Sequence, residues 1–229
     1  MRYMLKQLKK LIVLNKADFY LCIGLIGGIF LLTQIIIGVV MAVAKPDEGV
    51  RVSAFILVLA AFFMMLGVTS ANIMTTYLHS IQFGCTRRRG LALTMELVGV
   101  EYLVTIAVVV IGALIEDRLC PDLWKALAGR SMELEFFLDG IRPPWWVIPA
   151  APAAGAALGL IAAAIIQRFG RVGGWFLWGL WMVICVGQSF LPWEEHWFSS
   201  PWLLPLGIAL GLAAVLWSVW SLLHASIKA

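Results

Sequence analysis

The chain has 229 residues, of which 62% are hydrophobic and only 13% are charged, and its net charge is +4. A soluble domain contains about 25% charged residues and clearly fewer apolar ones, so this composition excludes an ordinary soluble protein. The cations flank long apolar blocks and form no basic domain, which argues against a nucleic-acid partner.

Residues 1–18 have the pattern of an amphipathic helix. One face is apolar, and the other contains most of the cations: Arg2, Lys6, Lys9, Lys10 and Lys16. Such a helix lies in the membrane interface, with its apolar side at the acyl boundary and its lysines toward anionic lipid headgroups. Simple anchoring and an added mechanical role are both compatible with this pattern.

Six apolar blocks follow, and each is long enough to cross a bilayer as a helix. A chain in lipid must satisfy its own backbone polar groups, which a helix does within the segment. The first block exceeds the ~7–15 apolar residues of a signal peptide, so we interpret it as a retained span. We therefore predict an all-α integral membrane protein in which residues 19–229 form one six-helix transmembrane domain, with spans at 19–44, 52–78, 91–115, 145–166, 174–192 and 202–223.

The flanking charges predict the orientation. One set of connecting segments contains eleven Lys and Arg residues and a single acid, whereas the opposite set contains six cations and ten acids. Positive charge is retained on the cytoplasmic side, so both termini are predicted to be cytoplasmic. Of the four cysteines, only Cys120 then lies outside, which predicts no intrachain disulfide, and no cysteine spacing indicates a metal site.

The second and third spans are joined by the sequence Phe83-Gly84-Cys85-Thr86-Arg87-Arg88-Arg89-Gly90. The two glycines predict a short helix or turn between two long helices. Three adjacent guanidinium groups suit lipid phosphates or the carboxylates of a protein partner. The positive-inside rule would also place them here without any further function.

The order of these elements resembles that of a known transporter family. A basic amphipathic helix, two spans, a cytoplasmic F-G-x-T-R-R stretch and four more spans are similar to the permease subunits of bacterial ABC exporters, in which the ATP-binding domains are separate chains. The resemblance implies that residues 81–91 dock on the ATPase, and the residues matching the motif are Phe83, Gly84, Thr86, Arg87, Arg88 and Arg89.

The same resemblance implies the setting of the protein. It places the chain in the bacterial plasma membrane, beside an ATP-binding subunit and a second permease copy or paralogue. ATP and Mg²⁺ belong to that partner, and this chain is expected to contain no cofactor of its own. The predicted outer segment 116–144 is expected to form two short surface helices at 122–128 and 132–139. This segment matches no family feature, so the substrate of relatives does not transfer to this chain. An amphipathic peptide, a lipid or a drug would all suit apolar spans with few polar groups.

Glu101 is the most informative polar residue inside a span. It lies about 15 Å along the third span, near the midplane of a hydrocarbon core of about 30 Å. An ionised acid there costs roughly 2.5–3.5 kcal/mol, so we expect a partner, and the candidates are Gln34, Thr69, Asn72 and Gln188. A role in the translocation pathway and a hydrogen bond between helices are equally compatible. Glu96 lies nearer the inner edge and is expected to pair with the arginines of the preceding turn.

An enzyme is the weaker hypothesis. The three histidines, His79, His196 and His224, are scattered over different loops, and the sequence has no H-E-x-x-H, no G-x-S-x-G and no phosphate-binding glycine loop. Without such a loop the chain is not expected to hydrolyse ATP. A secondary carrier should show paired broken spans, and none is visible. An intramembrane enzyme, a secondary transporter or a scaffold subunit are thus the alternatives to a permease.

Overall fold

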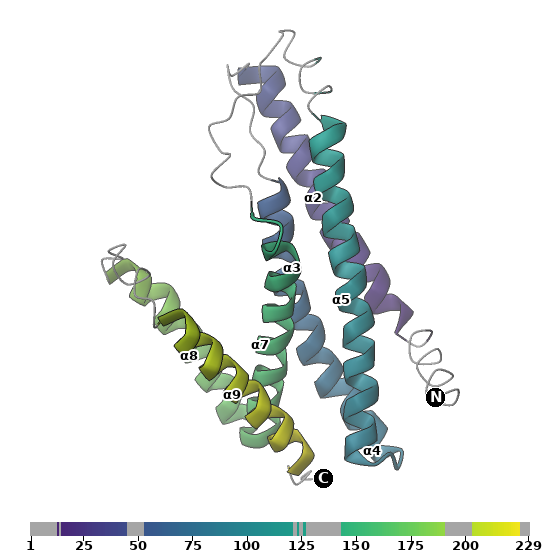
Figure 1. Cartoon of the computed structure of the whole chain (residues 1–229), viewed down its shortest axis with the longest axis vertical. Helices are drawn as coiled ribbons and strands as arrows, with labels where there is room; N and C mark the ends of the chain where they lie inside the picture. The colour runs from purple at the N-terminus through teal and green to yellow at the C-terminus, as the bar shows by residue number, and fades with distance from the viewer. Residues whose placement is uncertain are drawn as a thin grey trace. The chain divides into compact units, whose positions relative to one another are not determined.

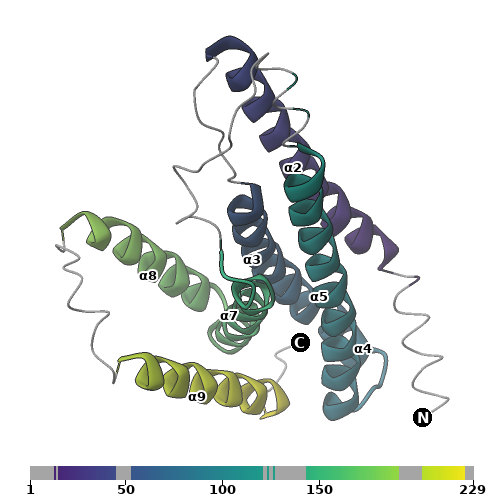
Figure 2. The ribbon, with the colours of Figure 1, turned by 45° about the horizontal axis from the view of Figure 1, so that its top comes forward.

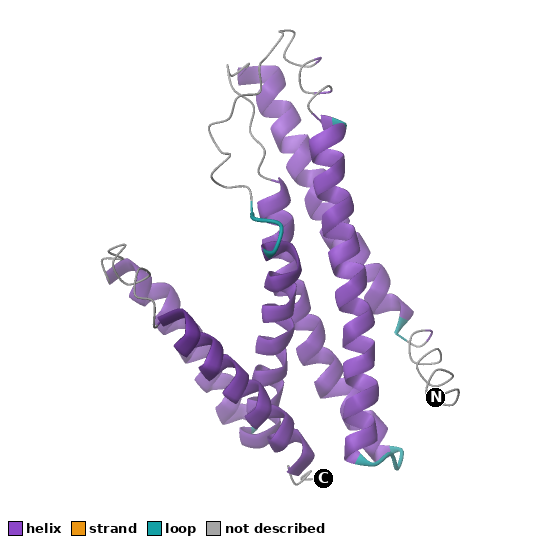
Figure 3. Cartoon of the chain, in the orientation of Figure 1, coloured by secondary structure: helices purple, strands orange, loops and turns teal. Residues whose placement is uncertain are grey.

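The computed structural model of the protein describes residues 13, 15–44, 53–120, 123, 126, 143–190 and 203–224. These residues form helices and connecting turns, and no strand is found among them, which confirms the predicted all-helical class (Figure 3). The elements are labelled in Figure 1: α2 (Lys16–Ala44), α3 (Ser53–Asn72), the π-helix η1 (Ile73–Tyr77), α4 (Leu78–Gln82), α5 (Arg87–Arg118), α7 (Val147–Phe169), α8 (Arg171–Phe190) and α9 (Leu203–His224).

Five of these helical stretches are long and apolar enough to cross a membrane. They are Lys16–Val40, Ser53–Gln82, Arg87–Arg118, Val147–Phe169 and Gly207–His224, with mean hydropathies between 1.7 and 2.4. Their outward faces are apolar as well; Leu31 and Ile35 of α2, for example, are 61% and 62% exposed. Because lipid, unlike water, solvates such side chains favourably, the chain is a multi-pass membrane protein.

The predicted fifth span, 174–192, corresponds to α8, which is helical to Phe190 and is not one of these five. Several side chains of α8 lie outside the described residues, so the five are a count for the described part of the chain alone. A sixth crossing therefore remains a prediction.

The chain forms two compact units. The first contains Met1–Val68 and Met95–Ala156, and the second contains Thr69–Thr94 and Ala157–Ala229. Most of the predicted interfacial helix 1–18 and of the predicted outer helices 122–128 and 132–139 lies outside the described residues.

The core of the first unit is built from α2, the start of α3, the later part of α5 and the start of α7. Its buried residues are Cys22, Ile26, Leu57, Val58, Ala61, Met64 and Val109. Figure 2 shows α2, α3 and α5 running beside one another. Gly155 of α7 meets α3 so closely that a Cβ atom would collide with the carbonyl oxygen of Phe62, so glycine permits this close approach of the two helices.

Other small-residue pairs do not pack in this way. A Cβ atom added at Gly24, Gly28, Gly207 or Gly211 would meet nothing within 4 Å among the described residues. These positions are therefore open on the surface of α2 and α9, and they make no close helix contact within this part of the chain.

The second unit contains the end of the second span, the start of α5, the later part of α7, and α8 and α9. A tight hairpin joins α7 to α8 at Gly170, which has a φ of +60°, a conformation that glycine adopts without a steric penalty. The Gly170 amide donates to the carbonyl of Ile166 at 2.7 Å and so closes the last turn of α7.

Candidate functional site

The predicted docking segment is a tight turn between α4 and α5. Gly84 has a φ of +84° directly after α4. Its amide donates to the carbonyl of Ile81 at 2.9 Å, and the Cys85 amide donates to the carbonyl of Ser80 at 3.0 Å. These two bonds form a Schellman motif, a common helix ending that glycine favours at this position. Of the two possibilities, short helix or turn, the structure contains the turn.

The next helix begins immediately after this turn. The carbonyl of Thr86 accepts the amide of Gly90 at 2.9 Å. This backbone hydrogen bond forms the first turn of α5, directly after the Schellman motif that ends α4. Gly90 is buried, and a Cβ atom there would collide with the Ser80 hydroxyl. The second predicted glycine therefore lies where the two helices pack closely, and the connection between them is short.

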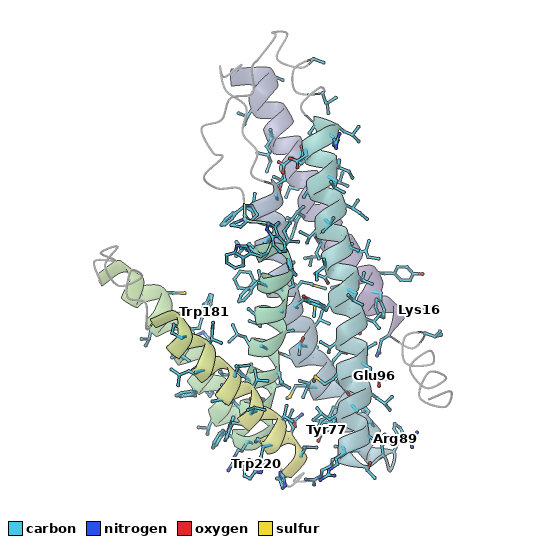
Figure 4. The ribbon with its side chains drawn as sticks, viewed as in Figure 1. Lys16, Tyr77, Arg89, Glu96, Trp181 and Trp220 are labelled. Atoms are coloured by element: carbon cyan, nitrogen blue, oxygen red, sulfur yellow. The ribbon has the colours of Figure 1, made fainter. Side chains whose placement is uncertain are left out.

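Most residues of the F-G-x-T-R-R motif lie on the surface of this turn. Phe83 is 86% exposed, and Gly84, Thr86, Arg88 and Arg89 are exposed too. Arg87 is different, because it is half-buried. Figure 4 shows Arg89 beside the α4–α5 turn, at the start of α5. The turn therefore presents one large apolar side chain and two guanidinium groups to its surroundings.

Arg87 and Tyr77 bind the end of α9. The Tyr77 hydroxyl donates to the carbonyl of Leu222 at 2.7 Å, and Arg87 Nη1 donates to the carbonyl of Leu223 at 3.3 Å. The last carbonyls of a helix have no partner within it, and a cation is favoured at that end. We call these two bonds the α9 clamp. The sequence analysis missed Tyr77, which is 1% exposed, because no local pattern marks a partner 145 residues away.

The second span contains a short π-helix that ends at Tyr77. Over Ile73–Tyr77 the second span widens from α-helical geometry, and Gln167 Nε2 of α7 donates to the carbonyl of Ile73 at 3.2 Å. Such interruptions leave backbone carbonyls open to side-chain donors, and they are frequent at functional sites. The π-helix ends at Tyr77, so it sets the rotation at which this ring leaves the helix toward α9.

A pocket of about 420 Å³ lies next to the α9 clamp and is lined by Thr86, Arg87, Arg88, Leu223 and His224. His224 Nδ1 lies 2.8 Å from the carbonyl of Trp220, and the two rings stack with centroids 4.9 Å apart. A carbonyl only accepts, so Nδ1 is the donor in this bond, and a neutral ring then has Nε2 as an acceptor. Among the described residues, the lining contains two guanidinium groups and one imidazole, and no acid.

A further cation, Arg168 of α7, lies against the aromatic residues of α9. The guanidinium of Arg168 lies 5.7 Å from the ring centroid of Trp217 and 5.9 Å from that of Trp220. Such cation–π contacts hold a guanidinium against an apolar helix face. The end of α9 is thus both aromatic and basic, and Figure 4 shows Trp220 and Tyr77 near this end.

The intramembrane acids lie in the first unit. Glu101 is 0% exposed in α5, as its predicted depth requires, and Glu96 is half-buried on the same helix. Among the candidate partners of Glu101, Gln34 uses its amide Nε2 to donate to Ser53 Oγ at 2.8 Å. Thr69 and Asn72 are buried in the second unit, and the side chain of Gln188 lies outside the described residues.

Glu116 is a second buried acid, and it is the first residue of the predicted outer segment 116–144. Helix α5 continues to Arg118, so Glu116 belongs to its last turn and is 2% exposed. Oε1 accepts the amide of Ser53 at 3.1 Å, and Oε2 accepts the amide of Ala54 at 3.0 Å. A carboxylate from one helix thus satisfies the first amides of another, where negative charge is favoured.

The surroundings of Glu116 include Cys120. Burial, and secondarily the negative charge of Glu116, raises the pKa of the Cys120 thiol. All four cysteines are free thiols, and Cys85 is the partly exposed one in the α4–α5 turn.

Comparison with known proteins yields no match: no family model, no curated protein and no solved structure is similar to the chain. The resemblance to ABC permeases therefore rests on the order of the elements and on the motif of the α4–α5 turn.

Proposed function

We propose that the chain is the permease subunit of a bacterial ABC exporter, and that its α4–α5 turn docks on a separate ATP-binding subunit. The observation that carries this proposal is that some side chains of the turn are exposed while another binds the helix α9. Phe83, Arg88 and Arg89 are exposed, whereas Arg87 ties the same turn to the end of α9. A surface that only obeyed the positive-inside rule would need no exposed phenylalanine.

The exposed side chains define the chemistry of the partner surface. A phenylalanine that is 86% exposed gains free energy when a partner covers it, and arginine and aromatic residues dominate protein interfaces. We expect the ATPase to present an apolar pocket for Phe83, rimmed by carboxylates that accept from Arg88 and Arg89.

The tight connection suits transmission of force. When ATP closes two partner subunits, a push on Phe83 moves the ends of the second and third spans together, because the Schellman motif and the packing at Gly90 leave little slack. Through the α9 clamp the same push reaches the last helix. In a dimer of permeases, tilting of these spans would change the opening of a pathway between the two copies.

The rest of the predicted topology belongs to this proposal. Six crossings with both termini in the cytoplasm require α8 to cross as well, and residues 1–18 to lie in the inner interface. The charge asymmetry of the connecting segments supports this orientation. An amphipathic peptide, a lipid or a drug is the expected substrate class, and Glu101 with Glu96, Asn72 and Gln34 are the polar candidates for the pathway.

The first test is identification of the partner. The tagged full chain, purified from its native membrane, is expected to retain a protein with a Walker phosphate-binding motif in a stoichiometric complex. The double variant Arg88→Glu/Arg89→Glu and the single variant Phe83→Ala should lose that protein, because they remove the exposed contacts and leave Arg87 on α9.

Arg118→Glu is the matched control for this test. Arg118 is exposed at the opposite end of α5, so the same charge reversal there should leave the complex intact. Copurification of no ATPase with the wild-type chain would contradict the proposal, as would full assembly and transport by the Arg88→Glu/Arg89→Glu variant.

A further inference from the structure

The pocket between the start of α5 and the end of α9 also has the composition of an anion site. We infer that it binds the phosphate group of a membrane phospholipid. This inference rests on the pocket lining and does not require the proposed ATPase partner.

The charge of the lining is the first step. Arg87 and Arg88 are cationic, and Arg87 uses Nη1 for the carbonyl of Leu223, which leaves its other N–H donors for a ligand. The hydroxyl of Thr86 adds a neutral donor, and the imidazole of His224 lies beside these groups. Guanidinium forks match the oxygens of a phosphate, and no carboxylate is found among the described residues that line the pocket.

The position of the pocket is the second step. Its walls come from the first turn of one apolar span, Arg87–Arg118, and from the last turn of another, Gly207–His224. Spans end where the hydrocarbon gives way to headgroups. Trp217 and Trp220 lie just before the pocket on α9, and indole rings favour this level.

The shape of the surroundings favours a lipid over a free anion or an acidic peptide. Leu223 lines the pocket, and the preceding turns of α9 expose apolar side chains, with Leu216 70% and Leu212 61% exposed. A phospholipid can place its phosphate among the cations and its acyl chains along this face. A soluble phosphate or a peptide carboxylate would use only the cations.

His224 is held in place by its neighbours. Trp220 stacks on the imidazole and accepts from its Nδ1, while Arg168 lies over the ring of Trp220. The ring is therefore oriented before a ligand arrives, which lowers the entropic cost of binding.

The experiment compares two adjacent arginines. Purified full-length protein in phosphatidylcholine nanodiscs is titrated with fluorescent phosphatidylglycerol, and separately with inorganic phosphate and with a fluorescent acidic peptide. Each cation near a headgroup contributes about 1 kcal/mol, so Arg88→Gln should weaken phosphatidylglycerol binding by roughly fivefold. The control Arg89→Gln, which removes a neighbouring charge outside the pocket lining, should bind nearly as well as the wild type.

Three results would overturn the inference. An equal loss in Arg89→Gln and Arg88→Gln would mean diffuse surface charge. Binding of inorganic phosphate as tight as that of phosphatidylglycerol would make the pocket a site for a soluble anion. Displacement of the lipid by the acidic peptide at equal concentration would make it a protein-docking site. Both variants leave Arg87 and Tyr77 intact, so α9 stays clamped.

Discussion

Two polar clusters in this protein each satisfy backbone groups at a helix end, one at an N-terminus and the other at a C-terminus. In the first unit, the Glu116 carboxylate accepts the first amides of α3; in the second, Tyr77 and Arg87 donate to the last carbonyls of α9. In both cases the sign of the charged group fits the helix terminus that it meets.

The clusters differ in what remains free after this task is done. Glu116 is 2% exposed, and both of its carboxylate oxygens are used by backbone amides. The α9 clamp instead borders a pocket of about 420 Å³ and a turn with exposed arginines. A closed cluster stabilises the bundle, whereas an open one has donors left for a partner or a ligand. The following substitutions test this difference.

Glu116→Ala should have the largest effect on stability. It leaves the amides of Ser53 and Ala54 without acceptors in a buried place, and each such group costs about 1–3 kcal/mol. We expect a loss of roughly 3 kcal/mol, measured as thermal unfolding in detergent micelles. Arg118→Ala, at an exposed position two residues along the same helix, is the control, and an equal loss in that variant would contradict the assignment of the effect to the two amides.

Tyr77→Phe should have an intermediate effect. It removes one hydroxyl and leaves the carbonyl of Leu222 without that donor, at a cost of about 1 kcal/mol. The reduced coupling should show as faster hydrogen exchange in the last turn of α9, detected by mass spectrometry. Unchanged exchange at the end of α9 would show that the clamp does not hold this helix.

Glu101→Gln should fold nearly as well as the wild type, because the amide keeps the size of the side chain and can still form hydrogen bonds. If Glu101 serves the pathway, transport by the complex reconstituted in vesicles should change while thermal stability stays within about 1 kcal/mol. Unchanged transport would assign Glu101, like Glu116, to the structural group.

Arg88→Glu/Arg89→Glu should have the smallest effect on stability, within about 0.5 kcal/mol, because both side chains are exposed. Its expected effects are on ATPase assembly and on phospholipid binding at the pocket, and not on folding. A large loss of thermal stability in this variant would mean that the turn is as structural as the Glu116 cluster, and the contrast between the two clusters would disappear.

The hydropathy of the sequence and the positions of its turn-forming glycines predicted much of this architecture. Long apolar blocks gave the helices, and the pair Gly84 and Gly90 gave the turn. The partners were not predictable, because hydropathy reports depth and not the rotation of one helix against another. Tyr77 meets a carbonyl 145 residues away, and Glu116 meets an amide 63 residues away. The π-helix that turns Tyr77 toward α9 has no sequence pattern that we recognise.

The position of the α4–α5 turn on the cytoplasmic side is tested most directly by its own cysteine. Cys85 is partly exposed, whereas Cys120 is buried and its raised pKa leaves less thiolate to react at neutral pH. A membrane-impermeant maleimide should leave Cys85 unmodified in intact cells and modify it after permeabilisation, with Cys85→Ser as the blank. Modification of Cys85 in intact cells would place the three arginines outside and contradict both the orientation and the docking of an ATPase on this turn.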